Sequence, residues 1–177
     1  MPLCPPCLQP LPNDKRGLVT VEFALMLGIL VTILLNGIEA ARWYYSKMQL
    51  DNATQMAAQA LFKACGTAQL PATTNCTAAT STITTALQSS SLGTAVTLDS
   101  GFPTEQHYCV NTAGALVIVG TLTAPPSNCS SVGNGGQTPG DYVLIQSRYS
   151  YTPLFAAVSF GSLLPAQLTS TTMIRLN

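Results

Sequence analysis

An isolated acid in a long apolar run is the first feature of this sequence that could do chemistry. Glu22 is the only charged residue among the 21 residues from Leu18 to Ile38, and Lys15, Arg16 and Gly17 stand directly before the run. A charged side chain near the centre of a membrane helix costs about 2.5–3.5 kcal/mol. Although Glu22 is nearer one end, where that cost is smaller, its position predicts that the carboxylate needs a partner.

Cysteines are the second reactive set. Six are present, and four of them follow the apolar run: Cys65, Cys76, Cys109 and Cys129. Four cysteines in about 110 residues indicate two disulfides in an oxidising compartment, with three possible pairings. We favour Cys65–Cys76 and Cys109–Cys129 because each pair closes a local loop.

Other candidate sites are weaker. Cys4 and Cys7 could form a redox or metal motif, but no βαβ pattern or second ligand pair accompanies them. His107 lies between Glu105 and Cys109, and a metal site there is disfavoured because a disulfide makes better use of Cys109. We expect no metal and no cofactor.

Charge and motifs argue against several classes of function. The net charge is zero, with only 8 % charged residues, so nothing indicates a nucleic-acid partner. No nucleotide-binding or nucleophile motif occurs, and Glu39 and Arg42 are predicted to form an ion pair on a helix surface rather than a catalytic pair. We therefore expect a protein that is not an enzyme.

One long helix is predicted over residues 18–65. Residues 18–38 are long and apolar enough to span a bilayer, and residues 39–64 lack Gly and Pro. The second half carries a repeat of seven residues, made by Trp43, Leu50, Ala57 and Ala64. This stripe predicts close packing against a sheet or another helix.

The region after residue 66 is predicted to be a small α+β domain stapled by the two disulfides. A short helix is expected over residues 80–90, and residues 124–140 read as a loop rich in Pro, Gly and Ser. Strands are expected at residues 95–98, 115–123, 142–151 and 169–176. An antiparallel sheet with one face covered by the long helix would join these parts.

The N-terminal segment and the distribution of charges predict a topology. Residues 1–17 contain five prolines and no apolar core typical of a secretory signal. Lys15 and Arg16 favour a cytoplasmic N-terminus, and the cysteine-rich region would then lie in the oxidising periplasm.

The run from Arg16 through Glu22, Phe23, Ala24 and Leu25, continued to the Ala-rich residues 51–60, resembles the TadE-like family. Its members resemble type IV pilins and act as minor pilins or pseudopilins of bacterial tight-adherence (Flp) pili. The resemblance covers residues 15–62. Family members often carry a proline six residues after the acid, where this chain has Gly28.

The resemblance implies a processing site and a set of partners. A prepilin peptidase would cut between Gly17 and Leu18, and Glu22, followed by Phe23, would pair subunits within the membrane. The partners implied are this peptidase, other pilin or pseudopilin subunits, an inner-membrane assembly platform and the lipid bilayer.

The resulting expectation is a minor pilin with four parts. Residues 1–17 would be a cleaved cytoplasmic leader and 18–38 a single inner-membrane span. Residues 39–65 would continue the helix into the periplasm, and 66–177 would form the exported domain, periplasmic or in an extracellular pilus. An uncleaved, single-pass anchored periplasmic binding module is the main alternative, and a thiol redox protein using Cys4 and Cys7 is a third.

Overall fold

The structure, a computed structural model, describes residues 16–66, 69–156 and 159–177. Its dominant element is helix α1, Arg16–Ala64, which runs without a break for 49 residues, about 70 Å. By length and composition α1 could cross a membrane. The helix is continuous through Gly28, and nearly all of the proposed leader lies outside the described residues.

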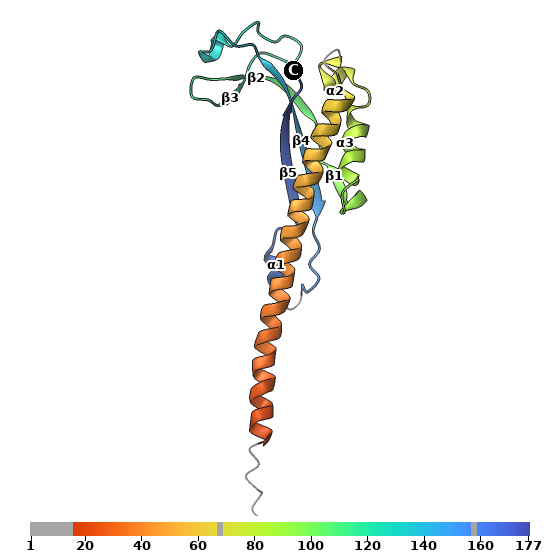
Figure 1. Ribbon diagram of the computed structural model, residues 1–177, viewed down its shortest axis with the longest axis vertical. Coiled ribbons are helices and arrows are strands. Elements are labelled where there is room, and N and C mark those ends of the chain that lie inside the picture. Colours follow the sequence, from red (N-terminus) through yellow and green to blue (C-terminus); the bar gives the residue numbers. More distant parts are fainter. Residues whose placement is uncertain (1–15, 67–68, 157–158) are drawn as a thin grey trace, which may run out of the picture.

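The second half of α1 packs against the rest of the protein (Figure 1). Its buried face holds mostly small or aliphatic residues: Ser46, Leu50, Ala53, Thr54, Ala57, Ala58, Leu61 and, just beyond the helix, Cys65. The expected stripe is therefore confirmed as far as Ala57, but Ala64 is exposed. A straight helix drifts about 20° per heptad from a seven-residue repeat, so the third repeat has rotated off the buried face.

The sheet has five antiparallel strands around a long central strand. These are β1 Val96–Leu98, β2 Thr104–Val110, β3 Leu116–Ile118, β4 Gly140–Ser150 and β5 Gln167–Arg175. β5 pairs with β4 along residues 142–150. β1 and β2 pair with different parts of β4, and β3 extends the sheet from β2.

Two layers enclose the core. Helices α1 and α3, Ala79–Gln88, lie side by side on the sheet, and the four-residue α2, Ala72–Asn75, precedes α3 (Figure 1). The alternation predicted for β4 is correct, since Val143, Ile145 and Ser147 all point into the core. The Thr54 hydroxyl contacts the Ser147 hydroxyl at 2.5 Å, a buried polar link between helix and sheet.

Two disulfides staple this domain. Cys65–Cys76 ties the end of α1 to the end of α2, and Cys109–Cys129 ties β2 to the loop that follows β3. The α+β, pilin-like fold class expected from the sequence, with its two disulfides, is confirmed.

Strand β2 was not predicted. Its inward residues are Glu105, His107 and Cys109, so the strand shows no apolar alternation. The strand expected over residues 115–123 is shortened to β3, and a 3₁₀ turn, Ser130–Val132, lies in the predicted 124–140 loop.

Candidate functional site

The first half of α1 is bare. Large apolar side chains from Val19 to Leu34 are exposed to 42–68 %, and no other described part of the chain covers them. In water such a surface would be strongly unfavourable, so it requires lipid or another protein. The exposed half coincides with the predicted span.

Glu22 and Phe23 lie on this bare surface. Together with Val19 and Met26, they line one face of the first helical turns. Phe23 is 67 % exposed, and Glu22 makes no hydrogen bond or ion pair with any described residue. The partner expected for this acid is therefore not supplied by the described part of its own chain.

Gly17 lies in the first turn of α1, followed at once by Leu18. A methyl group placed on Gly17 would meet nothing within 4 Å. The described packing therefore does not require a glycine at this position. The same holds for Gly28 and Gly37.

Glu39 corrects a prediction. It is not half of a surface ion pair but is completely buried, where it accepts hydrogen bonds from the Tyr151 hydroxyl and from the Leu154 and Phe155 amides, the last two at 3.1 and 3.2 Å. Arg42 instead lies over the Tyr151 ring, 5.7 Å from its centroid. The spacing of Glu39 from Ser46 and Leu50 matches the buried stripe, a signal that could have revealed its burial.

Electrostatics follow from this arrangement. The hydrogen bond from Tyr151 is the main reason that the pKa of Glu39 lies below its usual value, against the opposing effect of burial. Burial, reinforced by the Glu39 carboxylate, raises the pKa of Tyr151 to about 12. Glu39 is thus an ionised anchor for the chain that follows β4.

A second anchor lies one turn lower on α1. The Asn36 side-chain oxygen accepts a hydrogen bond of 2.8 Å from the Phe160 amide. Its amide nitrogen donates to the Thr32 carbonyl at 2.7 Å, and the Thr32 hydroxyl donates to the Gly28 carbonyl. Asn36 therefore holds the connecting chain, and Thr32 bonds within the helix.

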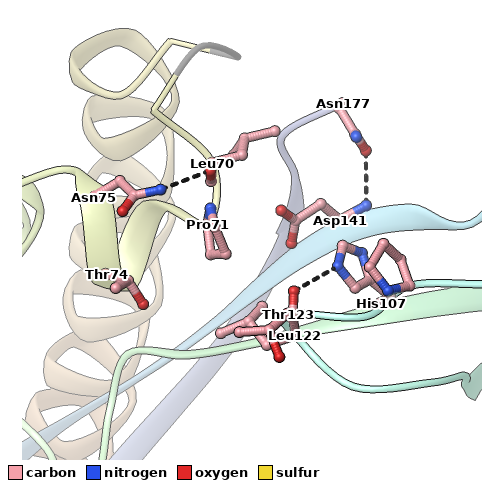
Figure 2. Close-up of a pocket in the computed structure, with 10 residues that line it drawn as sticks. Leu70, Pro71, Thr74, Asn75, His107, Leu122, Thr123, Asp141 and Asn177 are labelled. Atoms are coloured by element: carbon pink, nitrogen blue, oxygen red, sulfur yellow. Dashed lines mark hydrogen bonds between the residues drawn. The ribbon is translucent and has the colours of Figure 1, made fainter.

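A pocket of about 490 Å³ lies at the other end of the domain. Figure 2 shows His107 and Asp141 on neighbouring strands at its wall, with Leu70 and Pro71 across from them. The His107 ring contacts the Leu122 carbonyl at 3.2 Å, and the Asp141 amide donates to the Asn177 side chain at 2.7 Å.

Asp141 is 1 % exposed, and one of its carboxylate oxygens has no hydrogen-bond partner among the described residues. Burial and the neighbouring Glu105 carboxylate raise its pKa to about 6. Glu105 itself accepts hydrogen bonds from the Ala72 and Thr73 amides, both at 2.7 Å. Cys109 is consumed by its disulfide, and no three potential ligands converge in the residues that the structure describes.

The fold and the bare helix define a class of protein. A continuous N-terminal helix, apolar and uncovered in its first half and laid on a small antiparallel sheet in its second, is type IV pilin-like.

The family comparison agrees with this class. Residues 17–59 match the family model described as TadE-like protein, which confirms the predicted resemblance over that stretch. Comparison with curated proteins and with solved structures gave no match. Over these residues the chain is similar to a family of minor pilin-like proteins associated with tight-adherence pili.

Proposed function

We propose that this protein is a minor pilin or pseudopilin that takes part in assembling, initiating or priming a tight-adherence pilus. The observation that carries the proposal is the bare half of α1, which bears one acid without a partner in its own described chain. A surface of this kind serves both as a membrane anchor and as a packing surface in a bundle of such helices.

Processing at Gly17 is the second part of the proposal. A prepilin peptidase removes residues 1–17 by cutting before Leu18. The open space around Gly17 supports this, because the described packing does not require a glycine there. Recognition by the peptidase would account for the glycine instead. The disulfide-bonded domain faces the periplasm, where disulfides persist.

Pairing between subunits follows from the cut. Cleavage creates a positive α-amine on Leu18, one helical turn from Glu22. Two charges within a low-dielectric bundle are tolerable only as a pair, so the amine of one subunit meets the Glu22 carboxylate of a neighbour. The other subunits and the assembly platform in the inner membrane are the partners of this surface.

The test is the intact mass and N-terminal sequence of the protein from its native membrane, with and without the prepilin peptidase. We expect a start at Leu18 that depends on the peptidase. A start at Met1 in both strains would contradict processing and favour the second candidate, an uncleaved anchored binding module. The pocket beside His107 and Asp141 is the observation that favours that candidate. A start near Ala41 would contradict both.

A further inference from the structure

The chain between β4 and β5 returns down the side of α1 toward its bare half (Figure 1). We call its two described stretches, residues 151–156 and 159–166, the β4–β5 connection. It is held at two levels of the helix, by Glu39 near its start and by Asn36 at Phe160. Above these, the Trp43 ring nitrogen lies 3.4 Å from the Pro165 carbonyl.

The contacts with α1 define how deep this connection would lie relative to a bilayer. From Leu18 to Asn36 a helix rises about 27 Å, close to the thickness of a hydrocarbon core, about 30 Å. Asn36 therefore stands at the outer boundary of the core when Leu18 stands at the inner one. Trp43 is about 10 Å above Asn36 along the axis. The 3₁₀ turn η4, Phe160–Leu163, consequently begins at the level of Asn36, and the chain reaches the level of Trp43 at Pro165.

The side chains of the connection are uncharged, and several of the apolar ones are exposed. No charged residue occurs between Arg148 and Arg175. Leu163 is 84 % exposed and Leu154 59 %, and Phe160 is exposed as well. Leu163 is the most exposed large hydrophobic side chain among the described residues. Phe160 is tied to Asn36, where the bare apolar surface of α1 ends.

Several backbone amides of the connection donate hydrogen bonds within the protein. A loop can enter a lipid environment only if its polar groups are satisfied by the protein. The Leu154 and Phe155 amides donate to Glu39, and the Phe160 amide donates to Asn36. Other bonds among the described residues lie within the connection: Tyr151 amide to Ala166 carbonyl, Ser159 amide to Phe155 carbonyl, Gly161 amide to Ser159 hydroxyl, and Leu164 amide to Gly161 carbonyl.

Gly161 lies in close contact with α1. A methyl group on Gly161 would lie 2.9 Å from the Glu39 side chain and 2.9 Å from that of Pro153. The connection is therefore pressed closely onto α1. The position of the connection along the axis of α1 is fixed by this packing, so its depth in a membrane is set by the depth of α1.

We propose that the β4–β5 connection inserts Leu154, Phe160 and Leu163 into the outer leaflet of the bilayer, as a second membrane contact beside the α1 span. It fixes the depth and tilt of the exported domain before a subunit is taken into an assembly. The proposal rests on α1 spanning the membrane, as in the proposed function.

The test uses the full chain at high dilution in phosphatidylethanolamine–phosphatidylglycerol vesicles whose acyl chains carry bromine, a contact quencher of tryptophan. Trp43→Phe removes the native signal, and Leu163→Trp reports on the connection. Leu27→Trp in the span and Leu116→Trp on β3 are the matched controls, because both positions are exposed and apolar. Leu154→Trp is a second reporter, and intact disulfides verify folding.

We expect Leu163→Trp and Leu154→Trp to be quenched several-fold more than Leu116→Trp, and Leu27→Trp to be quenched strongly. If Leu27→Trp is quenched while both connection reporters behave like Leu116→Trp, the insertion is wrong and the span stands. If quenching of the reporters is absent at high dilution but the signals shift at high protein density, a second copy covers the surface and lipid contact is overturned. If Leu27→Trp is not quenched, α1 does not span the membrane, and both the proposed span and the proposed insertion of the connection are wrong.

Discussion

Two acids only 17 positions apart on one helix have opposite surroundings. Glu39 is buried and accepts hydrogen bonds from a tyrosine and two amides, whereas Glu22 lies on the bare surface with no partner in the described chain. Hydrogen bonds offset the cost of burying a carboxylate, but an acid left without a partner in an apolar surface is costly. The difference assigns Glu39 to the domain and leaves Glu22 available for the proposed contact between subunits.

Replacement of Glu22 tests that contact. We expect Glu22→Gln to insert normally, because removing the charge makes the span more apolar, but to lower incorporation into the pilus at least tenfold, about 1.4 kcal/mol of lost pairing. Co-purification with other subunits and counts of pili per cell measure this. Glu22→Asp, which keeps the charge, should retain part of the activity. Normal assembly by Glu22→Gln would contradict the ion pair.

Asp141 is predicted to make the domain sensitive to pH. Its pKa is about 6 in the folded protein, against 3.8 for the ordinary group, so the folded state prefers the protonated form. The acid imposes no penalty below pH 3.8, and stability is lost as the pH rises through 6. The facing groups are Glu105, which favours the proton, and His107, which opposes it.

We therefore expect Asp141→Asn to stabilise the domain by about 1–2 kcal/mol at pH 7.5 and to change little near pH 4. Unfolding of the full chain in detergent, followed against pH, measures the difference. Asp51→Asn is the matched control, because the Asp51 carboxylate is 42 % exposed and pairs with Lys47 at 2.6 Å. A benefit of Asp141→Asn that is equal at both pH values would refute the assignment.

At the scale of elements, the second half of α1 meets the sheet and α3 through small side chains. Ala53 and Ala57 are completely buried, which allows the helix to approach its neighbours closely. The same elements explain why β2 escaped prediction: its inward groups are polar and find their partners on α2, in a loop and in a disulfide. Apolar periodicity reports burial only when the buried side chains are apolar.

A pair of substitutions on α1 tests this packing. Ala57→Leu should lower the free energy of unfolding by about 1–3 kcal/mol, since added methylene groups find no space in a filled core. Ala64→Leu, at the exposed last residue of the same helix, should change the free energy of unfolding by less than about 0.5 kcal/mol. Denaturant unfolding measures both. Equal effects would mean that the buried face of α1 lies elsewhere.

At the scale of the whole molecule, α1 serves two environments. Its first half offers a largely apolar surface, while its second half, with α3 and the sheet, encloses the core and carries one disulfide at its end. The boundary between them lies at Asn36 and Glu39, where the β4–β5 connection ends its descent. No described residue from the first half of the helix therefore belongs to the hydrophobic core.

A fragment that begins at Asn36 should fold. We expect it to form both disulfides and to unfold in one cooperative transition, because the buried face of α1 begins at Glu39. Mass mapping under non-reducing conditions and calorimetry measure these properties. Free thiols, or the absence of a transition, would show that the domain depends on the span.

Sequence alone determined the parts whose signals are local. An apolar run of this length, the glycine–acid spacing after Arg16 and the even set of cysteines are written along the chain, and they indicated the long helix, the pilin-like class and the disulfide-bonded domain. Tertiary structure decided what depends on contacts between distant residues. The Tyr151 hydroxyl and the Leu154 amide reach Glu39 across more than 110 positions, so their burial of that acid could not be deduced from either neighbourhood. The position of Phe160 beside α1 has the same origin, because only the folded chain brings the β4–β5 connection to Asn36.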